Sequence, residues 1–200
     1  MATTSSSSPS ITLQQIFHNA RSHNAWLDKP VSDETLHQVY EAMEWGPTAA
    51  NSLPARILFV KKGPQKDKLL EAMAPGNVDK TKAAPVTAVL AYDLEFYEKL
   101  PKTFPHADAR SWFAGNDQAI KDTAEYNSAL QHGYFIIAAR SFGLDCGPMA
   151  GFDKKKMDEL FFKGTSWRSA MVCNIGYGDT AQLFPRSPRL SFDEACKILG

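Results

Sequence analysis

The sequence predicts an α+β protein in which helices flank a central, mostly antiparallel sheet. Amphipathic helical patterns outnumber strand patterns along the 200 residues. The short apolar strand patterns are scattered between the helices and lack the regular βα alternation of a doubly wound parallel sheet. Because no internal repeat or linker divides the chain, residues 11–200 are expected to form one domain. The Ser-rich residues 1–10 are expected to be a disordered leader.

The N-terminal part contains two helical patterns and a loop of small residues. Residues 11–20 place apolar side chains at roughly helical spacing and predict a first helix. Residues 31–47 predict a second, with Ser32 as N-cap, acidic residues in the first turn, and Gly46 with Pro47 at its end. The stretch that follows, "TAANSLPAR", displays small polar side chains and carries no Asp, Glu, Cys or His.

Two apolar, β-rich runs bounded by turn residues follow, at 55–62 and 84–93, and predict buried strands. Residues 64–73, between them, predict a short helix that ends near "APGN". The aromatic, proline-containing segment 94–116 fits neither the helical nor the strand period. Such an insertion is either a lid over a pocket or a packing flap, and both interpretations stay open.

The C-terminal half begins with a long predicted helix at 117–142, whose apolar second half should lie in the core or in an oligomer interface. Residues 144–153, "LDCGPMAGFD", are punctuated by Gly and Pro and predict a connection without regular structure. A helix capped by Asp153, a strand followed by a turn at 169–179 and a last short helix at 191–199 complete the chain.

Composition and missing motifs exclude several classes of function. The 22 Lys and Arg residues balance the 22 Asp and Glu residues, so charge favours neither nucleic acid nor an anionic membrane as partner. Three dispersed Cys residues indicate neither a disulfide framework nor a zinc site. There is no nucleophile elbow, P-loop or complete dinucleotide fingerprint. We expect a cytoplasmic protein, and, if it is an enzyme, the reactive group belongs to a bound cofactor.

Two groups of residues could bind a phosphorylated cofactor. One is "RSHN", after the first predicted helix, and the other is the arginine pair in "PRSPRL". Arginine offers paired donors to phosphate. Each group taken alone is better interpreted as solvated turn residues.

Taken together, the segments resemble the nitroreductase family of FMN enzymes. The motifs in the family's order are "ARSHNAW", "WGPTAANSLPAR", "GNVDK", "GLDCGPMAGFD", "NIGYGD" and "RSPRL", and the resemblance covers nearly the whole chain from about residue 13 onward. "PVSDETL", "EFYEKLP", "FPHADARSWF" and "PRLSFDEAC" are similar to the malonic semialdehyde reductase branch, which forms 3-hydroxypropionate in pyrimidine catabolism.

The resemblance implies an intertwined homodimer with FMN sites shared across the interface, and it implies roles by position. The ribityl phosphate and pyrimidine edge would be held by Arg21, Ser22, His23 and Asn24, with Arg189 and either Arg186 or Ser187 completing the phosphate contacts. The flavin ring would be contacted by Asn77, Lys80, Met149, Ala150 and Gly151, and from the partner subunit by Pro47, Thr48, Ala49 and Asn51. Two departures from the family pattern remove charged side chains from this site: Asn24 stands where many relatives have Arg or Lys, and Ala150 stands where several have Glu.

The implied function is hydride transfer from NADPH or NADH through flavin N5 to a small electrophile, here malonic semialdehyde. Arg110, in the aromatic insertion, is a candidate clamp for the substrate carboxylate. Two alternatives stay open: a broad nitroaromatic or quinone reductase, and, in a different class, a non-catalytic flavin-binding or interaction protein. No metal and no nucleic acid is expected.

Overall fold

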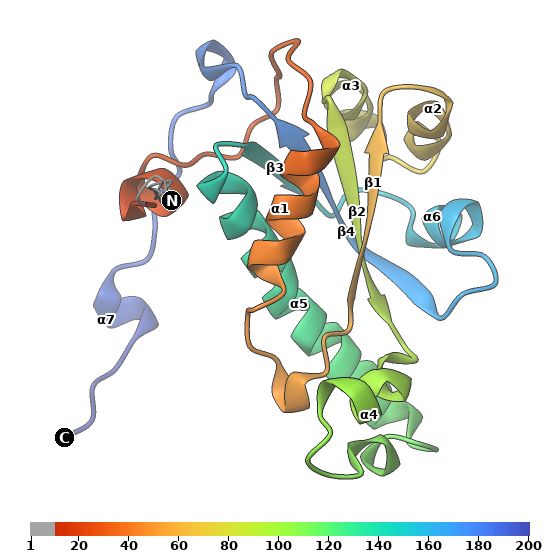
Figure 1. Cartoon of the computed structure of the whole chain (residues 1–200). Coiled ribbons are helices and arrows are strands. Elements are labelled where there is room, and N and C mark those ends of the chain that lie inside the picture. The colour runs from red at the N-terminus through yellow and green to blue at the C-terminus, as the bar shows by residue number, and fades with distance from the viewer. Residues whose placement is uncertain (1–10) are drawn as a thin grey trace, which may run out of the picture.

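A four-stranded antiparallel sheet forms the centre of the computed structural model, which describes residues 11–200. The predicted leader, residues 1–10, lies outside the described residues. The strands are β1 (Ala55–Lys61), β2 (Val86–Asp93), β3 (Asp145–Met149) and β4 (Trp167–Gly176), in the order β1-β2-β4-β3. All three neighbouring pairs are antiparallel, which confirms the predicted sheet (Figure 1).

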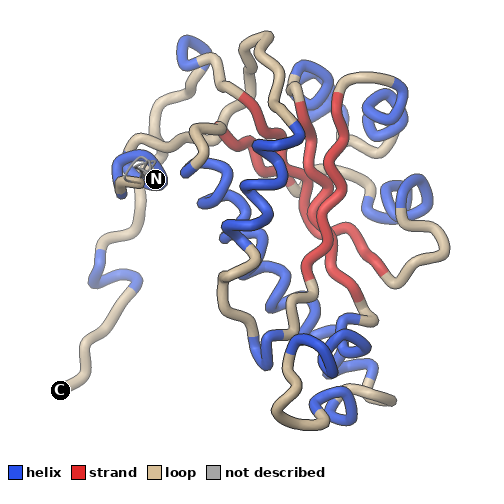
Figure 2. The backbone as a smooth tube through the Cα atoms, in the orientation of Figure 1, coloured by secondary structure: helices blue, strands red, loops and turns tan. Residues whose placement is uncertain are grey.

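Helices cover both faces of this sheet (Figures 1 and 2). α1 (Asp33–Met43) and the long α5 (Asp117–Ser141) lie on one face, whereas α2 (Pro64–Leu70), α3 (Pro75–Ala83) and α6 (Lys154–Phe161) lie beyond the other. Side chains of the central strand β2 alternate between two cores because successive strand residues point to opposite faces. Leu90 packs in the core that contains Phe135 of α5, and Val89 in the core that contains Met157 of α6.

Several predicted helix starts are confirmed by their caps, although the last helix is shorter than the predicted 191–199. Ser32 accepts a hydrogen bond from Thr35 N at 3.1 Å, and Asp153 accepts one from Lys156 N at 3.0 Å. The last helix, α7 (Phe192–Ala195), begins with a capping box formed by Ser191 and Glu194. Such caps satisfy backbone N–H groups that the first helical turn leaves without partners.

The aromatic insertion consists of three short helical pieces, η3 (Phe96–Lys99), α4 (Leu100–Thr103) and η4 (Ala109–Trp112). They form a small core of their own against the N-terminal half of α5. Phe113 packs edge-on against the buried Phe96 with ring centroids 5.0 Å apart, whereas Trp112 is 53% exposed. Phe113 is thus a packing residue, and the lid interpretation rests on Trp112 and the exposed parts of the segment.

The prediction that residues 144–153 form a connection without regular structure was wrong, because residues 145–149 form strand β3. Pro148 is tolerated because β3 is an edge strand with a ladder partner, β4, on one side only. Gly147 is required for close approach: a Cβ there would lie 2.4 Å from the backbone oxygen of His23. The N-terminal segment therefore runs directly against the outer side of β3.

The prediction of a first helix was largely wrong, because that helix is reduced to one π-helical turn, Gln14–His18, which has no buried residue. No element was predicted for the segment after "EAM", and the structure contains α3 there, which begins with Pro75 at its first position. Among residues 11–200, no helix is long and apolar enough to cross a membrane.

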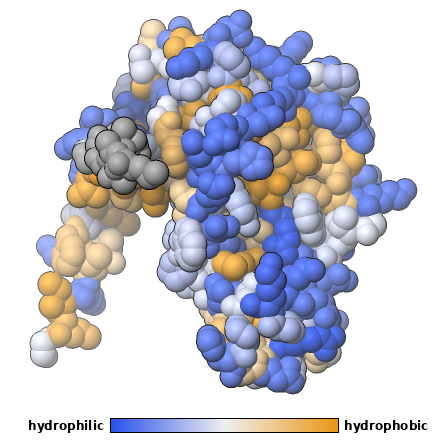
Figure 3. Space-filling view, viewed as in Figure 1, coloured by the Kyte–Doolittle hydropathy of each residue, from blue (hydrophilic) through white to orange (hydrophobic). Residues whose placement is uncertain are grey.

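The C-terminal arm, residues 183–200, extends away from the body of the chain (Figure 1). Apolar surface is visible along it (Figure 3). Its most exposed large apolar side chains, 60–90% accessible, are Phe184, Leu190, Phe192, Ile198 and Leu199.

Candidate functional site

A cavity of about 520 Å³ lies where the N-terminal segment, the end of α5 and the start of the C-terminal arm meet. We call it the arginine cavity, because four arginines line it. Among residues 11–200, no Asp or Glu lines it. The lining residues are Phe17, Ala20, Arg21, Ser22, Asn24, Arg140, Phe184, Pro185, Arg186, Ser187 and Arg189.

The four guanidinium groups donate to neutral backbone carbonyls. Arg186 Nη2 donates to His18 O at 2.7 Å and Ala20 O at 3.1 Å, and Arg189 Nη1 donates to Ser187 O at 2.9 Å. Carbonyl partners orient these side chains but do not neutralise them, and a guanidinium has five N–H donors. The remaining donors and the net positive charge suit an anion such as a phosphate.

Arg140 was not predicted as a site residue. It lies near the end of α5, lines the cavity, and donates from Nη1 to Ile16 O at 2.9 Å. A basic residue in the last turn of a helix is ordinary, because it complements the helix dipole. Only the fold, which brings the end of α5 beside residues 17–24, distinguishes Arg140 from any other such residue.

His23 does not line the arginine cavity, although its neighbours Ser22 and Asn24 do. Its side chain is 3% exposed, and its Nε2 lies 3.3 Å from Asp145 Oδ1. The ring also packs tightly on Gly178, where a Cβ would lie 1.9 Å from Nδ1. The imidazole therefore faces the sheet and not the arginine cavity.

A second group of predicted residues comes together at α3, and we call Asn24, Asn77, Lys80 and Gly151 the α3 cluster. Lys80 Nζ donates to Asn24 Oδ1 at 3.2 Å, and Asn77 Nδ2 donates to Gly151 O at 2.8 Å. A Cβ at residue 151 would lie 2.5 Å from Asn77 Nδ2, so glycine permits this contact. Asn24 belongs to both groups and joins the cluster to the arginine cavity.

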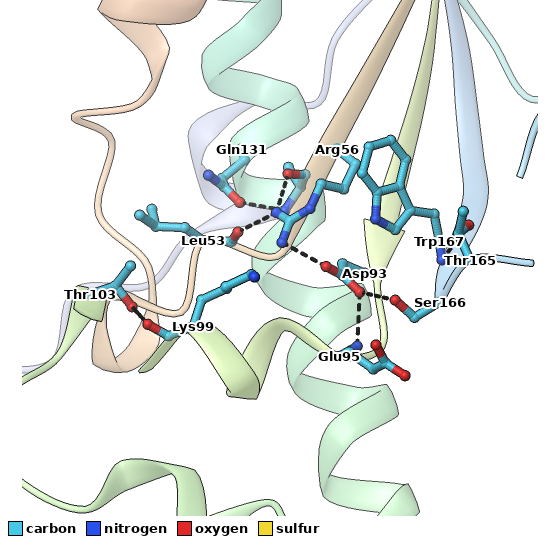
Figure 4. Close-up of polar contacts among 11 residues, drawn as sticks. Leu53, Arg56, Asp93, Glu95, Lys99, Thr103, Gln131, Thr165, Ser166 and Trp167 are labelled. Atoms are coloured by element: carbon cyan, nitrogen blue, oxygen red, sulfur yellow. Dashed lines mark hydrogen bonds and ion pairs between the residues drawn. The ribbon is translucent and has the colours of Figure 1, made fainter. Parts of the chain in front are cut away.

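Residues 47–53 lie away from the cavity in the same chain, beside the middle of α5 and beside α4 (Figure 1). Ala49 N donates to Asn127 Oδ1 at 2.7 Å, and Asn51 Nδ2 donates to Thr103 O at 2.7 Å. Arg56 donates from Nη1 to Leu53 O at 3.0 Å and also forms an ion pair with Asp93 (Figure 4). Within one chain, Pro47, Thr48, Ala49 and Asn51 are thus not brought to the other predicted residues.

This loop adopts a backbone conformation that non-glycine residues rarely take. Ala50, Asn51 and Leu53 have φ values of 49°, 47° and 44°. Each such residue costs on the order of 1–3 kcal/mol and persists only where surrounding contacts hold it. The contacts with α5 and α4 supply that restraint, and functional loops are a common place for it.

Arg110, the predicted carboxylate clamp, is engaged within the chain. Its Nε and Nη2 donate to Glu98 Oε2 and Oε1 at 2.8 and 2.7 Å, and its guanidinium lies 5.8 Å from the centre of the Tyr97 ring. Hydrogen bonding from Arg110 lowers the pKa of Glu98. A substrate carboxylate would therefore compete with Glu98 for Arg110. Among residues 11–200, no group of three His, Cys, Asp or Glu side chains could hold a metal ion.

Comparisons with known proteins match both the sequence and the fold. The sequence profile of the nitroreductase family matches residues 18–177. A Ralstonia nicotianae protein provisionally named an NADH dehydrogenase/NAD(P)H nitroreductase is 55% identical over 191 residues, which cover 96% of this chain and 97% of that protein. A Rhodopseudomonas palustris protein with the same provisional name is 53% identical over 195 residues, covering 98% and 100%. A protein provisionally named a nitroreductase, from Exiguobacterium sibiricum and solved in complex with FMN, has a TM-score of 0.84 at 20% identity and covers 95% and 98%.

Proposed function

The chain belongs to the nitroreductase family, and we propose that it is an FMN-dependent NAD(P)H oxidoreductase whose cofactor phosphate binds in the arginine cavity. The observation that carries the proposal is four arginines around one cavity without an acidic lining residue among residues 11–200. The α3 cluster lies beside that cavity and shares Asn24 with it. A structural relative is solved with FMN.

The chain's own residues would divide the work between the two groups. Arg21, Arg186 and Arg189 would hold the phosphate, together with Ser22 or Ser187. When bound, FMN supplies the hydride-transfer chemistry. Lys80 would place a positive charge where negative charge develops, and Asn77 and the backbone of residues 149–151 would orient the ring. This division needs no protein nucleophile or general base.

We also propose a homodimer in which residues 47–51 serve the partner's cofactor. Those residues lie away from the cavity of their own chain. The C-terminal arm exposes large apolar side chains to water, which is energetically unfavourable. Trp45, beside the end of α1, is likewise 84% exposed. A second copy of the chain would cover both.

A direct test compares FMN with riboflavin, which lacks the phosphate, by fluorescence titration. Wild-type protein should bind FMN more tightly. Arg189→Ala should weaken FMN binding about 10- to 150-fold, the equivalent of roughly 1.5–3 kcal/mol for a charged hydrogen bond, and should reduce the preference over riboflavin. Arg168→Ala is the matched control, because Arg168 also donates to local backbone carbonyls but lies outside the cavity.

Two outcomes would contradict the assignment. If wild-type protein does not prefer FMN to riboflavin, the arginine cavity is not the phosphate site. If it binds neither flavin at high concentration, the non-catalytic interaction protein replaces the enzyme as the best interpretation.

For the substrate, we propose a small electrophile, with malonic semialdehyde as the first candidate and Arg110 as its carboxylate clamp. Anaerobic reduction of FMN-loaded protein with NADPH or NADH, followed by an oxidant panel, compares malonic semialdehyde with a nitroaromatic and a quinone. If Arg110→Ala leaves the KM for malonic semialdehyde unchanged, the clamp is wrong. Faster oxidation by the nitroaromatic and quinone, with no preference for the aldehyde, would favour the broad reductase.

A further inference from the structure

Lys66 is a buried lysine of α2 that none of the roles above uses. The residue is 2% exposed, and among residues 11–200 no Asp or Glu forms an ion pair with it. Its Nζ lies 3.3 Å from Thr81 O, 3.3 Å from Ala84 O and 2.5 Å from Thr87 Oγ1. Two of these acceptors are carbonyls at the C-terminal end of α3.

Lys66 donates a hydrogen bond in each of its three contacts. Its two carbonyl partners can only accept. Thr87 Oγ1 gives its own hydrogen to Asn174 Oδ1 at 2.7 Å, so it too accepts from Lys66. The orientation of the Asn174 amide follows from its Nδ2, which donates to Lys80 O at 3.3 Å and Thr81 Oγ1 at 3.2 Å. Three donations require the three N–H bonds of an ammonium group.

This network ends at the backbone of a residue in the α3 cluster. The last carbonyls of a helix lack partners within the helix and carry its negative dipole end, which favours a cation there. Lys80 O accepts from Asn174 Nδ2 and also from Trp26 Nε1 at 3.1 Å. We infer that Lys66 is a positioning residue, whose buried ammonium fixes the last turn of α3 and thereby sets where Asn77 and Lys80 lie beside the cofactor.

The inference rests on the proposed function, and a role in stability alone explains the lysine less well. Burial, together with repulsion from Lys62, lowers the pKa of Lys66 to about 7. The charge is therefore costly at neutral pH, and a methionine of similar length could fill the same space. Replacing a buried charge by an apolar residue of similar volume is often neutral or stabilising. What the ammonium adds is the fixed geometry of the network.

The test uses three variants of the full chain and measures both flavin binding and the dynamics of α3. Lys66→Met removes the ammonium. Thr87→Val keeps the shape of residue 87 and both carbonyl acceptors of Lys66 but cuts the link to Asn174. Lys68→Met, on the same helix, is the control, because Lys68 lies over the Phe161 ring and outside the network.

We expect Lys66→Met to bind FMN and riboflavin about tenfold more weakly each, so that the ratio of the two affinities stays that of wild type. The midpoint potential of bound FMN should fall by roughly 30 mV, which for a two-electron couple means that the affinity for reduced FMN drops about tenfold more than the affinity for oxidised FMN. Amide hydrogens at the end of α3 should exchange faster in the cofactor-free protein. Thr87→Val should show smaller changes in the same direction, and Lys68→Met none.

The outcomes separate the two proposals. If the wild-type protein fails to bind flavin, the proposed function is wrong. Wild-type protein that binds flavin, while folded Lys66→Met and Thr87→Val match its affinities, potential and α3 exchange, overturns the positioning role. If Lys66→Met does not fold, the measurements on Thr87→Val alone decide whether Lys66 has the positioning role.

Discussion

The buried ion pair between Arg56 and Asp93 gives the sharpest prediction for stability (Figure 4). Arg56 Nη2 lies 2.6 Å from Asp93 Oδ2, and the two side chains are 20% and 7% exposed. Asp93 Oδ1 also accepts from Ser166 Oγ at 2.5 Å and from Glu95 N at 2.9 Å. The pair joins β1 to the end of β2, where the aromatic insertion begins.

Asp93→Ala removes three acceptor contacts and leaves the Arg56 guanidinium with backbone carbonyls only. Breaking a buried pair costs about 3–5 kcal/mol, and the partial exposure of Arg56 favours the lower end of that range. For a chain of this size, 1 kcal/mol corresponds to about 2–4 °C in Tm, so we expect a fall of roughly 6–12 °C. Urea denaturation followed by tryptophan fluorescence, together with a thermal scan, measures both quantities.

Glu98→Ala is the matched control, because it breaks the pair with Arg110, whose side chains are 45% and 41% exposed. Exposed pairs contribute about 0.2–1 kcal/mol because water screens both charges and the side chains lose entropy when they pair. If Asp93→Ala costs no more than Glu98→Ala, burial does not govern these pairs and the reasoning above is refuted.

Three more predictions concern the site, pH and assembly. Gly151→Ala should weaken FMN binding at least about tenfold, since its Cβ would lie 2.5 Å from Asn77 Nδ2, whereas Gly76→Ala, with open space around it, should not; equal affinities would contradict the crowding. Burial lowers the pKa of His132 from 6.5 to about 4, so the unfolded chain alone binds this proton in between, and stability should fall by up to about 3 kcal/mol as pH drops from 6.5 to 4. In urea titrations at several pH values, His132→Gln should lose this pH-dependent part of the stability. An unchanged pH profile in the variant would contradict the role of His132. Light scattering at micromolar concentration should report a dimer that deletion of residues 183–200 weakens; a wild-type monomer would remove the prediction.

The elements that the sequence predicts well are those whose local signals agree with their tertiary surroundings. In α1, the cap at Ser32 and the apolar positions Leu36, Val39 and Met43 all specify the helix, and these three side chains are buried. The runs that became β1 and β2 are apolar because strands packed between helix layers have little solvent-facing surface.

The missed elements depend on contacts that a local pattern does not contain. β3 was missed because Gly147 and Pro148 argue locally against a strand, whereas an edge position beside the N-terminal segment accepts both. α3 was missed because it buries little apolar surface of its own: Thr81 is its buried residue, and the helix is held at its end by Lys66.

In the candidate site, too, some placements were predicted from the sequence and others depend on tertiary contacts. Arg21, Arg186 and Arg189 lie around one cavity although 165 residues separate the first two along the chain; only the family resemblance, and no local pattern, grouped them as candidates. His23 was also expected at the cofactor, but its ring is buried toward Asp145, which no local pattern could indicate. Lys66 could have been suspected, because it lies three residues before the buried Leu69 on the apolar side of a short helix.

The position of Pro148 in β3 has a consequence for how the sheet can grow. The outer side of β3 offers no N–H at Pro148, and its Cys146 oxygen is already bonded to His23 N at 2.9 Å. At the opposite edge, β1 has a ladder partner on one side only and is bordered by surface hollows that Phe59 and Lys61 line. The addition of a further strand to the sheet is therefore favoured at the β1 edge over the β3 edge. Any additional strand, whether from a physiological partner or from a misfolded chain at high concentration, should join at β1, and charged substitutions along that one strand should be enough to suppress aggregation.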